Sequence, residues 1–171
     1  MNIIISPAKK MNVNNDDLVN EYKPVFMDKT NILYDKLKSL SYDELKKLLA
    51  CNDDIAELNY DRYKYMNLDK NLSPAILTYE GIQYKYMSPD SFSEEEFNYI
   101  KSHLKILSGF YGVLNPFDGV VPYRLEMQAK LKVENSKNLY ADAFVGTVKF
   151  NFTFCHCFCT SYRQHTIEPP Q

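Results

Sequence analysis

The hydrophobic positions of this chain follow two periods, one typical of helices and one typical of strands. Within residues 29–40, four apolar side chains recur at helical spacing, as they do on one face of a helix: Ile32, Leu33, Leu37 and Leu40. Three consecutive isoleucines, Ile3 to Ile5, are closed by Ser6 and Pro7 and predict a short buried strand. The chain therefore combines helices with strands.

Two serines predict helix starts, because each is followed three residues later by a glutamate. In such a capping box, the hydroxyl and the carboxylate both satisfy backbone amides that the helix leaves free. Ser41 with Glu44 begins a helix that reaches residue 50, and a second helix follows a break at residues 51–53. Ser93 with Glu96 begins another helix, whose apolar positions continue to residue 107.

Strands are expected between and after these helices. The candidates are residues 75–79, continuing over 82–86, then residues 111–114 and 120–121. Alternation of this kind predicts a single mixed α/β (α+β) domain, with a central mixed sheet flanked by helices. The two helices predicted over residues 41–70 form an N-terminal pair.

Glycine is scarce and concentrated in one stretch. Residues 103–127 hold three of the five glycines, Gly109, Gly112 and Gly119. Glycine is placed where a backbone turns sharply or approaches another group closely. We expect this stretch to be the backbone-dense centre of the fold.

Composition excludes some classes of protein. The chain has 171 residues, of which 45% are hydrophobic and 25% charged, which is typical of one soluble domain. The net charge of −2 means that any nucleic-acid site must be a local basic patch. No apolar run approaches the roughly 20 residues that span a bilayer, and residues 1–10 lack the pattern of a signal peptide. We expect a cytoplasmic protein with reduced thiols.

Four segments carry a family resemblance: ISPAK at residues 5–9, IAELN at 55–59 with Arg62, LSGFYGVL at 107–114, and VPYRLEM at 121–127. Together they resemble the YaaA family of bacterial peroxide-stress proteins. The resemblance implies an unusual mixed α/β fold and protection against hydroperoxides. It also implies binding of double-stranded DNA through a helix-hairpin-helix and a positive cleft.

The chain also departs from that family. Its members run to roughly 250 residues, in the upper part of the usual domain range, and the likeness ends near Tyr140. We therefore expect a partial YaaA-like domain over residues 1–147, truncated at its C-terminus, and a divergent, disordered tail over 148–171. Asn115 stands where the family tends to have arginine, and Gln128 where it has glycine.

The candidates for DNA contact are basic side chains, which bind phosphates. Residues 101–140 carry six basic and three acidic side chains, a net of +3, whereas residues 41–70 carry five basic and seven acidic ones, a net of −2. A solvated helix pair is therefore an equal alternative over 41–70. The ten candidates are Lys9, Lys46, Lys47, Arg62, Lys64, Lys101, Lys105, Arg124, Lys130 and Lys132.

A second interpretation is an enzyme acting on a nucleobase or nucleotide. Arginine can hold a phosphate or carboxylate, glutamate can transfer protons, and tyrosine can orient a substrate. The candidate residues are Ser6, Lys9, Tyr123, Arg124 and Glu126. A structural Arg124–Glu126 ion pair beneath a tyrosine is the simpler alternative, and an inactive, shortened chain is a third.

A cluster of thiols near the end suggests a metal, since Cys155, His156, Cys157 and Cys159 lie close together with His165 nearby. Zinc sites, however, usually space their ligands as C-x₂₋₄-C, and alternating side chains of a strand point to opposite faces. We therefore predict no metal site and no cofactor.

Overall fold

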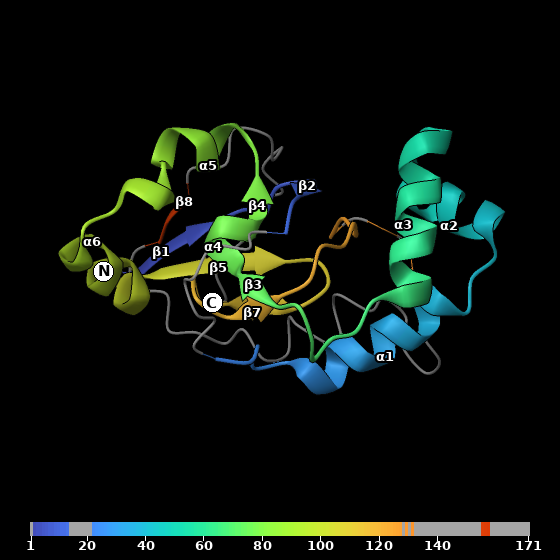
Figure 1. The fold of residues 1–171 in the computed structure, drawn as a ribbon, viewed down its shortest axis with the longest axis horizontal. Coiled ribbons are helices and arrows are strands. Elements are labelled where there is room, and N and C mark those ends of the chain that lie inside the picture. Colours follow the sequence, from blue (N-terminus) through green and yellow to red (C-terminus); the bar gives the residue numbers. More distant parts are fainter. Residues whose placement is uncertain (1, 14–21, 128, 130, 132–154, 158–171) are drawn as a thin grey trace, which may run out of the picture.

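A mixed sheet forms the centre of the computed structural model, which describes residues 2–13, 22–127, 129, 131 and 155–157 (Figure 1). Its strand order is β6-β5-β1-β8, from β1 (Asn2–Ile5), β5 (Leu104–Ser108), β6 (Gly112–Leu114) and β8 (Cys155–Cys157). Strand β1 is parallel to β5 and β8, whereas β6 is antiparallel to β5. The expected mixed α/β fold is confirmed.

The strand predicted at the isoleucine run is confirmed. Its partner, β5, lies in a segment predicted to be helical. Ile5 pairs with Ile106, and both are buried. The helix predicted to run to residue 107 ends earlier, since α6 is Glu94–His103 and residues 104–108 form β5. Pairing with β1 on one edge and β6 on the other gives these residues two ladders of hydrogen bonds, which outweighs their local helical pattern.

Three helices form one end of the molecule (Figure 1): α1 (Met27–Lys38), α2 (Tyr42–Leu49) and α3 (Asp53–Tyr65). Both predicted capping boxes are present, at the starts of α2 and α6. Asn52 accepts from the amide of Ile55 and so begins α3 without a glutamate. Helix α3 contacts both α1 and α2.

Residues 75–87 differ from their prediction. In place of one strand, the chain forms α4 (Ala75–Thr78), the short strand β4 (Tyr79–Glu80) and α5 (Ile82–Met87). The amides of Ala75 and Ile76 donate to the carbonyls of Asp118 and Pro116, which are distant in sequence. Long-range hydrogen bonds therefore decide the conformation that an apolar run leaves ambiguous.

Short strands tie the periphery to this centre. Strand β2 (Lys10–Met11) pairs with β4, and β3 (Ser73–Pro74) pairs with β7 (Gly119–Val120). A 3₁₀ turn, η1 (Pro89–Ser91), connects α5 to α6. Among the described helices, none has the length and apolar character needed to cross a membrane.

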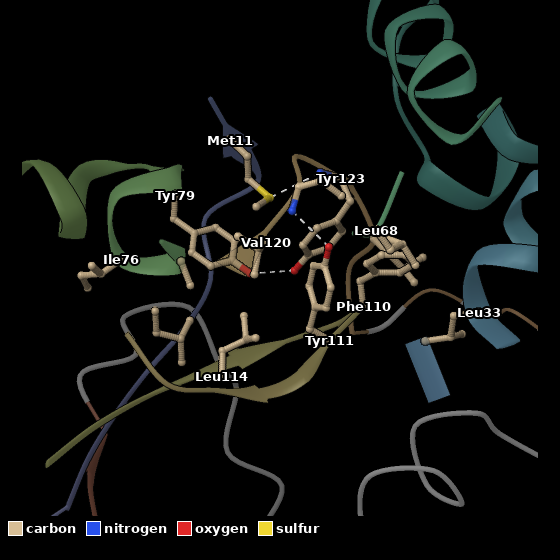
Figure 2. Packing of buried hydrophobic residues seen from close by; sticks show 14 of the residues in the cluster. Met11, Leu33, Leu68, Ile76, Tyr79, Phe110, Tyr111, Leu114, Val120 and Tyr123 are labelled. Carbon is tan, nitrogen blue, oxygen red and sulfur yellow. Dashed lines mark hydrogen bonds between the residues drawn. The ribbon is translucent and has the colours of Figure 1, made fainter. Parts of the chain in front are cut away.

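An aromatic core fills the centre of the fold (Figure 2), where Tyr79, Phe110, Tyr111 and Tyr123 pack against Met11. Ser108 Oγ accepts from the amides of Phe110 and Tyr111 at 3.1 and 2.8 Å. Its own hydrogen therefore faces the hydroxyl of Tyr123 at 2.7 Å, which in turn lies 2.9 Å from the hydroxyl of Tyr79. These linked hydrogen bonds satisfy hydroxyl groups that burial would otherwise leave unpaired.

Candidate functional site

Two segments distant in sequence meet at the surface, the loop after β1 and residues 121–127. Lys9 Nζ lies 2.8 Å from Glu126 Oε1, and Arg124 Nη2 lies 3.7 Å from the same oxygen. The three side chains are 66%, 16% and 35% exposed for Lys9, Arg124 and Glu126. A partly exposed carboxylate thus lies between two cations, one exposed at the surface and one largely buried.

A glycine lies in close contact with each of these two segments. A Cβ on Gly109 would lie 2.4 Å from the carbonyl oxygen of Leu125, and a Cβ on Gly81 would lie 3.0 Å from Ala8 Cβ. Only a residue without a side chain allows the backbone of residues 124–127 to lie so close to Gly109. At this position the expected backbone-dense centre is confirmed.

Helix α3 adds a third side to the site. Tyr63 Oη donates to the carbonyl of Arg124 at 2.7 Å, and Arg62 Nη2 donates to the carbonyl of Met11 at 3.4 Å. Met11 also accepts from the amide of Tyr123 through Sδ at 3.5 Å. Burial lowers the pKa of Arg62, although a guanidinium stays charged at neutral pH.

We call Lys9, Arg62 and Arg124 the basic cluster. With Glu126 as its carboxylate, these four side chains carry three positive charges and one negative, a net of +2. The neighbouring Lys10 is paired with Glu80 at 2.7 Å and adds no net charge. An arginine and a lysine placed in this way bind oxyanions such as phosphate and carboxylate.

Two buried polar atoms near the cluster have no hydrogen-bond partner among the described residues, Arg124 Nε and Asn59 Oδ1. Asn59 lies one helical turn before Tyr63 on the buried face of α3, and it is 2% exposed. Buried polar groups are nearly always paired in folded proteins. At each of these two atoms, a water molecule or a ligand can therefore complete the hydrogen bonding.

The remaining enzyme candidates lie differently. The carbonyl of Ser6, at the start of the same loop, accepts from the hydroxyl of Tyr84 at 2.9 Å. Tyr123 is 3% exposed, and its hydroxyl is held in the core by Ser108 and Tyr79. Burial raises the pKa of Tyr123, partly offset by those hydrogen bonds. The structure therefore brings Lys9, Arg124 and Glu126 together but turns the Tyr123 hydroxyl inward.

The other cations predicted to contact DNA are dispersed. Helix α6, which carries Lys101, lies at the opposite end of the molecule from α2 and α3 (Figure 1). Lys46 is paired with Asp53 at 2.5 Å, and Lys105 donates to Asn115. Lys47 is exposed on α2, Lys64 Nζ lies 5.5 Å from the Tyr65 ring centre, and Lys101 Nζ lies 5.6 Å from that of Tyr22. Lys130 and Lys132 lie outside the described residues.

The predicted absence of a metal stays a prediction. Among the residues that the structure describes, no group of three or more His, Cys, Asp or Glu side chains could hold a metal ion. The Cys155–Cys157 backbone forms β8, while Cys159 and His165 lie outside the described residues. The tail predicted over 148–171 lies almost wholly outside them as well.

A model of the family described as peroxide stress protein YaaA matches residues 1–143. The chain belongs to the YaaA family. It is 61% identical over 140 residues to a UPF0246 protein of Desulfitobacterium hafniense, which covers 82% of this chain and 56% of that protein. It is 53% identical over 139 residues to one of Pediococcus pentosaceus, covering 81% and 55%. It thus spans little more than half the length of the curated relatives it matches.

All four YaaA-like segments contribute to the same site. Residues 5–9 supply Lys9, residues 55–62 supply Asn59 and Arg62, and residues 121–127 supply Arg124 and Glu126. The fourth segment, residues 107–114, supplies Gly109 behind Leu125. Reasoning from the sequence did not single out Met11 or the unpaired oxygen of Asn59, because neither spacing nor residue type shows a contact across the fold.

Proposed function

We propose that this chain protects cells against hydroperoxide damage in the cytoplasm by binding double-stranded DNA, with phosphates held by the basic cluster. The observation that supports the proposal most is the meeting of Lys9 and Arg124 on one oxygen of Glu126. Arg62 on α3 donates to the carbonyl of Met11, whose sulfur accepts from the amide of Tyr123, the residue before Arg124. These side chains come from segments far apart in sequence. A surface assembled in this way suits a localised phosphate contact.

Family membership supports the peroxide part of the proposal, since the matching family is that of a peroxide stress protein. Cys51 is a free thiol, which is typical of proteins in reducing compartments. Among the described candidates, the pairing of Lys46 with Asp53 and the distance of α6 from α2 and α3 favour a short footprint on the duplex. We therefore propose contacts to a few phosphates in place of a long basic groove.

The test is the binding of a duplex of about 20 base pairs, measured by fluorescence anisotropy at increasing salt. Each phosphate contact changes the slope of log K against log [salt] by about −0.9. Arg124→Gln and Lys9→Gln should each weaken binding and reduce the slope by about 1. Lys36→Gln, an exposed lysine on α1, is the charge-matched control and should leave both unchanged.

An affinity that does not change with salt, or equal slopes for Arg124→Gln and Lys36→Gln, would contradict DNA binding at this cluster. Survival of bacteria producing the same variants under hydrogen peroxide connects binding to protection. We expect Arg124→Gln to lower survival and Lys36→Gln to leave it unchanged.

The α2–α3 pair is a second surface that we propose for DNA contact, as a helix-hairpin-helix. Lys47 and Lys64 are exposed there, but Asp53 at the turn neutralises Lys46. We therefore expect the α2–α3 pair to contribute less to DNA binding than the basic cluster does. Lys47→Gln in the same salt titration measures it.

An enzyme acting on a nucleobase or nucleotide is the second candidate, and one observation favours it. Arg124 is only 16% exposed, and its Nε and the Oδ1 of Asn59 are buried without a described partner. A buried donor on Arg124 and a buried acceptor on Asn59, one helical turn before Tyr63, suit a small ligand better than a duplex. Binding of a free nucleoside monophosphate that excludes the duplex would favour this candidate.

A further inference from the structure

We propose that Arg124 binds a phosphate oxyanion through the edge formed by Nε–H and Nη2–H, and that Glu126 occupies this edge until the ligand displaces it. The inference rests on the proposed function only in naming phosphate as the anion. It assigns Glu126 a role as a built-in competitor, which residue type alone does not reveal.

The geometry of a guanidinium supports the first part. The N–H groups of Nε and Nη2 point in the same direction and form a fork that matches two oxygens of a phosphate or carboxylate. Here Nη2 lies 3.7 Å from Glu126 Oε1, beyond the usual hydrogen-bond distance, and Nε has no partner among the described residues. One donor of the fork, Nη2, therefore lies beside a carboxylate, and the other, Nε, has no partner among the described residues.

The fork is held rigidly from behind. The carbonyl of Arg124 accepts the Tyr63 hydroxyl, and the next residue, Leu125, lies directly over Gly109. The Arg124 side chain is also largely buried, so it loses little conformational freedom when it binds. These contacts preorganise Arg124, the group from which phosphate would displace Glu126.

Glu126 is the partner that can move. Its side chain is 35% exposed, and its carboxylate lies 2.8 Å from Lys9, whose side chain is 66% exposed. A free phosphate or phosphomonoester carries a charge of about −1.5 to −2 and at least three acceptor oxygens, more than the single charge of a carboxylate. It would take over both the fork and Lys9, while Glu126 turns toward solvent. A duplex phosphodiester carries a single charge, so it competes with Glu126 less strongly.

The same phosphate chemistry has two sources, the backbone of a duplex and a free phosphate. The experiment therefore uses two probes, a duplex of about 20 base pairs and inorganic phosphate, with the full 171-residue chain. Affinities are measured for wild type, Glu126→Gln, Arg124→Lys and the control Glu95→Gln, an exposed glutamate on α6. Circular dichroism confirms that each variant is folded.

We expect Glu126→Gln to bind inorganic phosphate about fivefold more tightly, because a half-exposed like charge is removed from the site. Arg124→Lys keeps the charge but loses the fork, and it should bind about tenfold more weakly. Glu95→Gln should match wild type. Unchanged or weaker binding by Glu126→Gln would overturn the proposal.

A measurement on the wild-type protein guards against misfolded variants. The Nε–H resonance of Arg124, assigned by its loss in Arg124→Lys, should shift when phosphate is added, and no shift at saturation would overturn the fork. If Glu126→Gln gains phosphate affinity while no protein binds duplex, the fork stands and DNA binding fails. If duplex binding depends on salt but is equal in wild type, Glu126→Gln and Arg124→Lys, DNA binding stands and the fork fails.

Discussion

The hydroxyl of Tyr63 donates a 2.7 Å hydrogen bond to the backbone carbonyl of Arg124. Tyr63 is 1% exposed and its ring packs against Phe110, so the contact lies inside the protein. It joins α3, at one end of the molecule, to the segment that carries Arg124 and Glu126. The position of Arg124 is therefore coupled to the packing of α3.

Replacing Tyr63 by phenylalanine tests this coupling. The variant leaves a buried carbonyl unpaired, and we expect a loss of about 1–2 kcal/mol in the free energy of unfolding. Phosphate binding should weaken too, since Arg124 loses a positional restraint. Tyr65→Phe is the control, because Tyr65 lies on the same helix and is 74% exposed. Urea unfolding should leave that control within 0.5 kcal/mol of wild type, as is usual for surface changes.

Substitution of Gly109 should disturb both fold and site. In Gly109→Ala the new methyl would lie 2.4 Å from Leu125 O, so the 124–127 backbone must shift. We expect a destabilisation of about 2–3 kcal/mol and weaker anion binding. Gly81→Ala, with its nearest contact at 3.0 Å, should cost less. Equal melting temperatures for Gly109→Ala and wild type would show that the close approach is not required.

Ser108 should be critical for stability although it is a small side chain. In Ser108→Ala the amides of Phe110 and Tyr111 lose an acceptor and Tyr123 loses a partner, all in the core. We expect a loss of about 3 kcal/mol. Ser102→Ala removes an exposed hydroxyl from α6 and serves as the control. Thermal unfolding followed by circular dichroism measures both.

Asp118 should make stability depend on pH. Burial raises its pKa above 3.8, although hydrogen bonds from Asn115 and the charge of Lys105 act in the opposite direction. A carboxyl whose folded-state pKa is raised contributes its stability fully below the unfolded value and loses it as the pH rises through the folded value. The stability of wild type relative to Asp118→Asn should therefore decrease as the pH rises above 3.8.

Urea unfolding of both proteins across this range gives the measurement, with Asp90→Asn, an exposed aspartate in η1, as the control. A constant difference between wild type and Asp118→Asn at every pH would refute the assignment.

Part of the fold could be predicted from local sequence. The capping boxes at Ser41 and Ser93 begin α2 and α6 as expected, because a cap involves residues only three positions apart. The isoleucine run forms β1, since β-branched residues suit a buried strand. Residues 75–87 and 104–108 were predicted wrongly, because hydrogen bonds to Asp118, Pro116 and β1 select their conformation.

The sequence by itself determined the mixed fold class, the family and the residue types able to hold an anion. Only the tertiary structure decided that Lys9 and Arg124 meet at Glu126, that the Tyr123 hydroxyl turns into the core, and that α6, which carries Lys101, lies far from α2 and α3. The physical reason is the distance along the sequence over which each kind of interaction acts. Caps and periodicities act within one or two helical turns, whereas a binding site depends on contacts between segments that meet only when the core is packed.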